Sequence, residues 1–317
     1  MENTANKLRI IFGDWTFGVE NDKTHYIFSY AKGGLESLVK NGKEWLYRTP
    51  RPTFWRAVTD NDRGSGFGFK SGMWMGADLY MNCNSVEVTV DGNNMGLPQS
   101  PFINKFSNIE YAQKVIIKYT YETSTIPSTT VDVCYTVVAG GSLSVTMTYH
   151  GKVGLPELPL LGMRFIMPTV AKGFEYEGLS GETYPDRMAG GVHGIYNVEG
   201  LPVTPYLRPQ DCGVHMDNKW LKIVRNTTLN NSDKSTDDFS LQFEKVNDDF
   251  AFSCLPYTAH ELENATHIEC LPPQRRTVLT MLAKVRGVGG IDSWKTDVEE
   301  AYRINAEKDY EFTFTIE

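Results

Sequence analysis

Thr130-Val-Asp-Val-Cys-Tyr-Thr-Val-Val-Ala-Gly-Gly-Ser-Leu-Ser-Val-Thr-Met-Thr-Tyr149 is the stretch that decides the fold. On both sides of its centre, apolar side chains alternate with polar ones, which is the pattern of a strand with one buried face. Gly140-Gly141 lies between the two alternating runs and is a hairpin turn signal. The stretch therefore predicts two antiparallel strands joined by a tight turn.

The same alternation recurs along the chain, whereas helical patterns are scarce. The best helix candidate runs from Thr258 to Ala265, with Thr258 as N-cap and Glu261 completing a capping box. Many strands with almost no crossover helices predict an all-β fold, a large antiparallel β-sandwich in a single domain over residues 1–317. Residues 151–159 could join two halves of it. Further strands are expected at Ser85–Val90, Lys114–Tyr121, Leu221–Val224, Phe239–Phe243, Thr277–Val285 and Tyr310–Ile316.

Composition narrows the possible partners. The chain has 31 Lys and Arg against 39 Asp and Glu, a net charge of -8 with no basic block, which argues against nucleic acid or an anionic membrane as partner. There is no secretion signal and no apolar run long enough to span a bilayer, so we expect a cytoplasmic protein. Five scattered cysteines indicate buried free thiols and no zinc ribbon.

Three long stretches lack the strand pattern, at residues 50–78, 174–218 and 286–298, and long loops of this kind are usually functional. In the first, the run Asp60-Asn-Asp62 offers oxygen ligands for a cation, but turn and capping roles are favoured. The glycines that follow predict a mobile flap rather than a phosphate-binding loop, because no strand-loop-helix context surrounds them.

The second stretch contains three carboxylates, Glu177, Glu182 and Asp186, which suggest the acid and nucleophile of a glycosidase. Salt bridges to Arg187 and Arg208 are the favoured alternative. His267 and Cys270 are the nearest approach to a metal-binding pair, and the spacing is weak. The sequence thus assigns no catalytic residue and no metal ligand to this chain.

The third stretch contains Gly287-Val-Gly-Gly-Ile-Asp-Ser-Trp294. Glycines permit turns that can hold a large flat ring at a fixed place on the surface, and an indole suits the apolar face of a sugar. Taken alone, an ordinary turn before a core tryptophan is the favoured interpretation.

Four motifs change that balance. They are Arg51-Pro-Thr-Phe-Trp-Arg-Ala-Val-Thr-Asp-Asn-Asp-Arg-Gly64, Glu182-Thr-Tyr-Pro-Asp-Arg187, Thr204-Pro-Tyr-Leu-Arg-Pro-Gln-Asp-Cys-Gly213 and Arg286-Gly-Val-Gly-Gly-Ile-Asp-Ser-Trp294. Together they resemble the C-terminal domain of large bacterial β-galactosidases, in which the motifs follow one another in the same order. The resemblance covers nearly the whole chain.

The chain looks like the small subunit of heterodimeric β-galactosidases, which lacks the barrel domain. The resemblance implies a β-supersandwich of the galactose-mutarotase-like type. It also implies a large-subunit partner that carries the catalytic glutamates and binds Mg and Na, with no cofactor on this chain.

Residue by residue, the resemblance makes Trp294 a stacking platform for the sugar and Gly64 the start of a mobile active-site loop, residues 64 to about 73. Asp292 is a further candidate for substrate binding. Ile291 departs from the family, which has an aspartate at this position, so any polar role there is open.

The resulting hypothesis is a subunit that completes the pocket for lactose and other β-galactosides and is inactive alone. A free-standing mutarotase-like epimerase, with a histidine acid and a carboxylate base, and a non-enzymatic carbohydrate-binding module are the alternatives. An obligate partner also requires an apolar surface. Phe54, Trp55 and Trp74 are candidates for it, although the core is the favoured location for all three.

Overall fold

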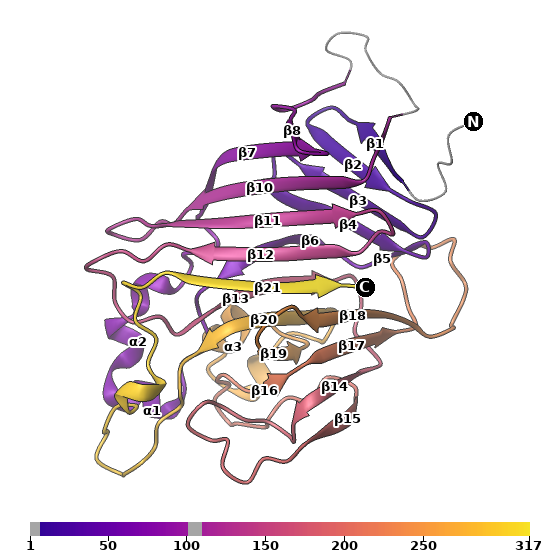
Figure 1. The fold of residues 1–317 in the computed structure, drawn as a ribbon. Helices are drawn as coiled ribbons and strands as arrows, with labels where there is room; N and C mark the ends of the chain where they lie inside the picture. Colours follow the sequence, from indigo (N-terminus) through magenta and orange to yellow (C-terminus); the bar gives the residue numbers. More distant parts are fainter. Residues whose placement is uncertain (1–6, 101–109) are drawn as a thin grey trace.

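The computed structural model describes residues 7–100 and 110–317, and antiparallel strands dominate it (Figure 1). Three sheets are present in this part of the chain. A six-stranded sheet has the order β5 (Lys43–Glu44), β4 (Gly34–Lys40), β3 (Thr24–Ser29), β2 (Thr16–Glu20), β1 (Leu8–Phe12) and β9 (Tyr111–Ala112). A five-stranded sheet has the order β16 (Val214–Asn218), β19 (Phe250–Leu255), β20 (Thr277–Val285), β13 (Leu160–Met167) and β6 (Arg48–Thr53).

The third sheet is the largest and contains most of the strands that the sequence predicts. Its order is β15 (His193–Glu199), β14 (Gly173–Leu179), β17 (Trp220–Arg225), β18 (Phe239–Lys245), β21 (Tyr310–Ile316), β12 (Leu143–Tyr149), β11 (Thr130–Val138), β10 (Lys114–Glu122), β7 (Asn82–Val90) and β8 (Asn93–Asn94). The helical segments are α1 (Asp60–Ser65), α2 (Phe67–Lys70), α3 (Ala259–Asn264) and the short 3-10 turns η1 (Gly72–Trp74), η2 (Ile268–Cys270) and η3 (Glu300–Tyr302).

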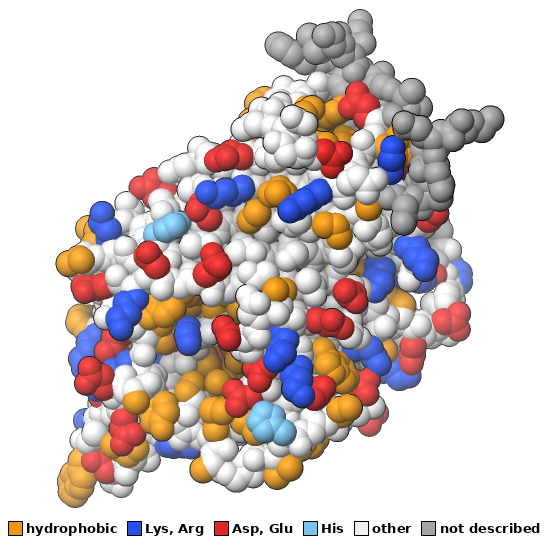
Figure 2. Space-filling model, viewed as in Figure 1, with side chains coloured by type: hydrophobic (Ala, Val, Ile, Leu, Met, Phe, Trp, Pro, Cys, Tyr) orange, Lys and Arg blue, Asp and Glu red, His pale blue; other side chains and the backbone are white. Residues whose placement is uncertain are grey.

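The hairpin of β11 and β12 forms as predicted, with Val133 opposite Met147. Alternate side chains of both strands are fully buried. Burial of each large apolar side chain stabilises the fold by about 1.5 to 3 kcal/mol. The outward residues are polar, so one face of the ten-stranded sheet meets solvent. On that face Figure 2 shows cationic and anionic side chains interspersed, as in the pair of Lys118 and Asp132 at 3.1 Å.

The inner face of the ten-stranded sheet covers both smaller sheets. Phe28 of β3 packs on Tyr135 of β11 with ring centroids 5.5 Å apart. Phe165 of β13 packs on Phe314 of β21 at 6.0 Å. One contiguous buried cluster contains residues from all three sheets. The predicted all-β antiparallel fold class is confirmed, and residues 151–159 do run from the large sheet to the five-stranded one.

The prediction of irregular structure is wrong in part for two stretches, residues 50–78 and 174–218. Residues 50–53 belong to β6, whose prolines Pro50 and Pro52 are compatible with pairing because β6 is an edge strand. The stretch 174–218 contains three strands, β14, β15 and β16. The helix at α3 is confirmed with its capping box, since Thr258 and Glu261 exchange both hydrogen bonds. Within the two described ranges, no helix is long and apolar enough to cross a lipid bilayer.

Candidate functional site

All four motifs meet around one cleft of about 560 Å³. The first motif supplies the start of α1, the second and third supply loops on either side of β15, and the fourth follows β20. Residues more than 200 positions apart in the sequence therefore border the same space. Its lining is Thr59, Asp60, Asn61, Glu182, Tyr184, Arg187, Thr204, Tyr206, Gln210, Asp211 and Val288.

The glycine-rich segment of the fourth motif is held against this cleft by Asp186. The Asp186 carboxylate accepts hydrogen bonds from the backbone N–H groups of Val288 at 3.0 Å and Gly289 at 2.8 Å. Arg187 donates to the carbonyl oxygen of Gly289. Because a Cβ atom at Gly287 would lie 2.8 Å from the Asp186 carboxyl carbon, only glycine allows the backbone to come this close.

The first motif holds the same segment from the other side. Asn61 donates from Nδ2 to the carbonyl oxygen of Val288 at 2.9 Å, and a Cβ atom at Gly290 would lie 2.6 Å from that Nδ2. Gly290 has a φ of 77°, in the left-handed region. Hydrogen bonds from two other motifs thus fix the backbone that leads to Trp294.

Trp294 itself projects from the end of this segment with 86% of its surface exposed. The expectation of a core tryptophan is therefore wrong, and a surface ring is present as the resemblance implies. Ile291, at the departure from the family, is also half-exposed. Its side chain places an apolar group where the family has a carboxylate.

Asp292 shapes the turn beneath the ring. Its carboxylate accepts hydrogen bonds from the backbone N–H of Trp294 at 2.9 Å and from the Thr296 hydroxyl at 2.6 Å. The Thr296 hydroxyl, followed by the Trp294 N–H, holds the pKa of Asp292 below its usual value. A direct contact of Asp292 with substrate stays a prediction, whereas its support of the Trp294 backbone is visible in the structure.

Gly64 lies beside the same segment. A Cβ atom at Gly64 would be 3.7 Å from Cγ of Lys295. The sequence predicts an irregular loop over residues 60–74, and this prediction is wrong. These residues form two short helices and a 3-10 turn. Thr59 caps α1 in a capping box with Asp62, so the predicted capping role of the Asp60-Asn-Asp62 run is confirmed. The mobility of residues 64 to about 73 stays a prediction.

A buried charge network joins α1 to the fourth motif. Asp62 and Arg56 are both 1% exposed and pair at 2.7 Å. Arg286, fully buried, approaches Asp62 at 3.4 Å and Asp297 at 2.6 Å. Arg56 also donates to the carbonyl oxygen of Gly287 at 3.1 Å. Arg56, Asp62 and Arg286 lie inside the motifs, but the contacts of Arg286 with Asp62 and of Arg56 with Gly287 span more than 200 residues and are not predictable from the sequence.

Asp211 lies in the floor of the cleft and was also missed. The Tyr184 hydroxyl donates to it at 2.8 Å. Burial raises the pKa of Asp211 to about 7, and the neighbouring charge of Arg56 opposes this rise only in part. A carboxyl group with such a pKa exchanges its proton near neutral pH, unlike an ordinary aspartate.

The three carboxylates considered for glycoside hydrolysis are each engaged elsewhere. Glu177 accepts from the Trp220 indole N–H at 2.9 Å, Glu182 accepts from the Thr204 hydroxyl at 2.7 Å, and Asp186 holds the glycine segment. The favoured prediction of salt bridges to Arg187 and Arg208 is therefore wrong for Glu177 and Glu182, whose described partners are other residues. Of the two expected arginine partners, Arg187 approaches Asp186 at 3.7 Å.

Other candidates are placed as follows. Phe54, Trp55 and Trp74 are core residues, as favoured. The cysteines are free, but Cys270 is exposed, so the expectation that all are buried is wrong. Among the residues described, His, Cys, Asp and Glu form no group of three suited to a metal ion.

Apolar side chains are also exposed on α2 and around η1. Phe69 of α2 is 95% exposed, and Met73 and Met75 around η1 are partly exposed. Lys70, next to Phe69, lies 3.9 Å from Asp297 in the Trp294 segment, so α2 and this segment are neighbours. Figure 2 shows hydrophobic side chains gathered on the lower left of the molecule, where Figure 1 places α1, α2 and the segment after β20.

Comparison with known proteins gives consistent results. The family model described as Beta galactosidase small chain matches residues 20–316. A Beta-galactosidase small subunit from Latilactobacillus sakei is 57% identical over 100% of this chain and 99% of its own length. A Beta-galactosidase from Halalkalibacterium halodurans is 31% identical over 99% of this chain, which spans only 28% of that relative.

Among solved structures, a galactose mutarotase-like protein from Lactobacillus casei aligns with 95% of this chain and 99% of its own, at 11% identity and a TM-score of 0.41. The family match and the full-length relative cover all four motifs and the Trp294 segment. The chain therefore belongs to the β-galactosidase small chain family.

Proposed function

We propose that this chain is the small subunit of a heterodimeric β-galactosidase that hydrolyses terminal β-D-galactose residues of lactose and related β-galactosides. In this proposal the large subunit carries the catalytic glutamates and the Mg and Na sites, and the small subunit completes the substrate pocket. The full-length similarity to a relative named as a small subunit supports the assignment. The assignment is also supported by the larger Beta-galactosidase relative, because this chain matches only 28% of its length.

The single observation that carries the proposal is the combination of an exposed ring with a fixed backbone. Trp294 is 86% exposed, yet the segment before it is held by Asp186, Asn61 and Arg56. A large apolar ring is costly to leave in water, so a rigid support for it points to a ligand or partner. Stacking of the indole on the apolar face of galactose uses both properties.

The surface around Trp294 suits a protein partner. Ile291, three residues before the ring, exposes apolar area, and so do Phe69, Met73 and Met75 on α2 and around η1. Aromatic residues and methionine are enriched in the buried centres of protein interfaces. We place the large subunit against this surface, so that its active site faces Trp294 and the helices α1 and α2.

The chemistry assigned to this chain is binding and positioning. The Trp294 ring orients the sugar and Asp292 supports the backbone of the ring. Residues 64 to about 73, which begin beside Lys295, close over the sugar as a flap. Asp186 and the pair of Arg56 and Asp62 are positioning residues, because each acts on the ring through the backbone of the fourth motif.

The proposal is tested by expressing the two subunits separately and assaying each with an aryl-β-galactoside. We expect no hydrolysis by either chain alone and full activity after mixing, with co-elution of the two chains in size-exclusion chromatography. Hydrolysis by the small chain alone would refute the proposal. A chelator should abolish the magnesium-dependent part of the activity without separating the chains, because the metal sites are assigned to the large subunit.

A carbohydrate-binding module is the alternative that the exposed Trp294 also favours. Such a module should bind galactose or lactose measurably by itself, whereas half a pocket should bind them at least about tenfold more weakly than the assembled enzyme. Titration of the isolated chain with lactose distinguishes the two. A mutarotation assay on the same sample tests the epimerase alternative.

We also propose a cytoplasmic location. All five cysteines are free, including the exposed Cys270, which fits a reducing compartment. Detection of the protein in a soluble cell fraction, with its thiols reactive toward an alkylating reagent, tests this. Recovery in the culture medium would contradict it.

A further inference from the structure

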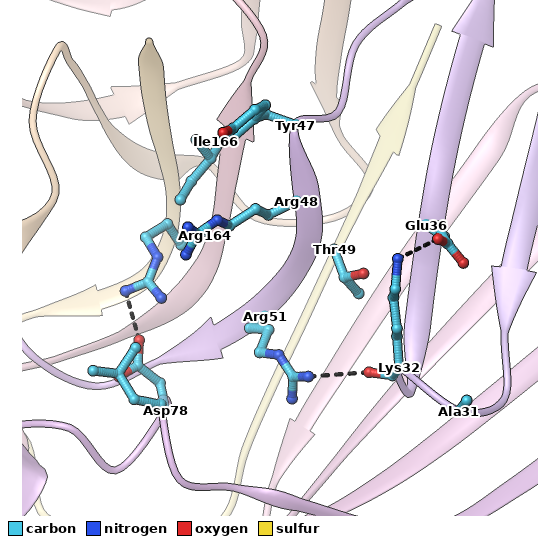
Figure 3. Close-up of a pocket in the computed structure, with 11 residues that line it drawn as sticks. Ala31, Lys32, Glu36, Tyr47, Arg48, Thr49, Arg51, Asp78, Arg164 and Ile166 are labelled. Atoms are coloured by element: carbon cyan, nitrogen blue, oxygen red, sulfur yellow. Dashed lines mark hydrogen bonds and ion pairs between the residues drawn. The ribbon is translucent and has the colours of Figure 1, made fainter. Parts of the chain in front are cut away.

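A second cleft, of about 530 Å³, lies between strands β6 and β13, the turn at residues 31–32, the start of β4 and the turn at residues 78–79 (Figure 3). It shares no lining residue with the cleft beside the Trp294 segment. Four cationic side chains line it, against only two carboxylates. These are Lys32, Arg48, Arg51 and Arg164, and Glu36 and Asp78.

Strand pairing brings two of the cations together. Arg51 of β6 lies directly opposite Arg164 of β13 in the antiparallel register. Like charges in this position repel and destabilise a sheet unless they are neutralised. Arg48 extends from the same strand toward Arg164 in Figure 3. The protein carries a net charge of -8, so this excess of positive charge is local.

The two carboxylates neutralise only part of the charge. Asp78 is 1% exposed and pairs with Arg164 at 2.5 Å, while the Thr53 hydroxyl donates to it at 3.2 Å. Burial works against ionisation of Asp78, yet the neighbouring His260 and Arg164 hold its pKa below the usual value. Arg164 is therefore held in place by a buried carboxylate.

Arg48 and Arg51 lack such a partner. Glu36 pairs with Lys32, and Arg51 donates to the Lys32 carbonyl oxygen at 3.0 Å. In the described part of the chain, neither Arg48 nor Arg51 forms an ion pair with a carboxylate. Two guanidinium groups thus border the cleft with hydrogen-bond donors available.

Guanidinium groups match the oxygens of phosphate and carboxylate with paired N–H donors. The cleft is within the size range of sites for small organic molecules. Tyr47 and Leu79 expose apolar surface at its rim, which suits the uncharged body of such a molecule. We propose that this cleft binds a small organic anion, with its phosphoryl or carboxylate oxygens between Arg48 and Arg51 and with Arg164 as a third donor. The site is separate from the proposed galactoside pocket and does not depend on that proposal.

The test is calorimetric titration of the full chain at constant ionic strength, first with inorganic phosphate and then with galacturonate. We expect saturable binding at one site per chain. Arg48→Gln and Arg51→Gln should each weaken binding by about tenfold or more, because each removes a charge-assisted pair of hydrogen bonds. Lys172→Gln is the matched control, since Lys172 is an exposed lysine that pairs with Asp238 away from the cleft, and binding should not change.

Saturation by phosphate alone identifies a phosphoryl ligand, and saturation by galacturonate alone identifies a carboxylate ligand. Both results support the site, as does saturation by the two probes in competition. Neutral galactose should not compete. The proposal is overturned if neither probe saturates, or if Arg48→Gln binds as the unmodified chain does. Arg48 is exposed and forms no ion pair in the described chain, so its replacement should leave the thermal midpoint unchanged and the result interpretable.

Discussion

The replacement Asp186→Asn tests how the Trp294 segment is held. The Asp186 carboxylate is only 6% exposed and accepts two backbone hydrogen bonds, from Val288 and Gly289. Asparagine keeps the shape but has one acceptor oxygen instead of two, and it presents an amide group as a donor where an acceptor is needed. The substitution therefore removes at least one charge-assisted hydrogen bond without creating a cavity.

The magnitude follows from the kind of bond lost. A hydrogen bond to a charged group contributes about 1.5 to 3 kcal/mol, and burial leaves little solvent screening to reduce it here. Each 1.4 kcal/mol is about a factor of ten in an equilibrium constant. Local opening of the segment should therefore become about 10 to 100 times more frequent. The free energy of global unfolding should fall by the same amount, about 1.5 to 3 kcal/mol, because the bond is lost from the native state.

Native-state hydrogen exchange of the backbone amides measures this opening directly. Protection of the Val288 and Gly289 amides should fall by about 10 to 100 times in Asp186→Asn. Glu182→Gln is the matched control, because Glu182 lies on the same loop but, among the described residues, accepts from the Thr204 side chain and from no backbone N–H. Unchanged protection at residues 288 and 289 would refute the conclusion that the Asp186 carboxylate holds this backbone in place.

Three further outcomes follow from the structure. Trp294→Ala should lower kcat/KM of the assembled enzyme by the equivalent of about 1 to 3 kcal/mol, with Trp294→Phe intermediate, and identical steady-state kinetics would show that the ring does not touch the sugar. Asp62→Asn leaves the buried Arg56 without its carboxylate partner, whereas Arg286 keeps Asp297. Urea unfolding should therefore show a loss of about 3 to 5 kcal/mol, against less than about 1 kcal/mol for Glu20→Gln, which breaks the partly exposed pair with Arg9; equal losses would contradict the network. The pKa of Asp211 is about 7 in the folded protein and 3.8 as its ordinary value. Between these two pH values the folded protein keeps the proton of Asp211 and the unfolded chain releases it. The native state therefore loses stability as the pH rises from about 4 to about 7. The stability of Asp211→Asn relative to the unmodified protein should therefore increase from about pH 4 to about pH 7. A difference in denaturant midpoint that stays constant over this pH range would contradict the prediction.

The sequence predicts some strands and misses others for a physical reason. β11 and β12 face solvent on one side, so their side chains alternate and the pattern is readable. β13 is buried on nearly all positions and shows no alternation, and β6 contains two prolines that only its edge position explains. The short helices α1 and α2 are too rich in glycine for a helical pattern to appear.

The site divides in the same way. Trp294 and Gly64 were found through motif resemblance, and the structure places their segments side by side. The hydrogen bonds of Asp186 could not be predicted, because their donors are backbone N–H groups about 100 residues further along the chain. The cationic cleft was missed as well, since Arg51 and Arg164 meet only when β6 pairs with β13.

The most direct measurement is a titration of this chain into a fixed amount of the separately purified large subunit, with aryl-β-galactoside hydrolysis as the readout. The account predicts no activity at zero small chain, a rise that saturates near one chain per large subunit, and a lower plateau at the same stoichiometry for Trp294→Ala. Activity of the large subunit that is complete without this chain, or hydrolysis by this chain alone, would contradict the claim that the pocket is shared between two chains.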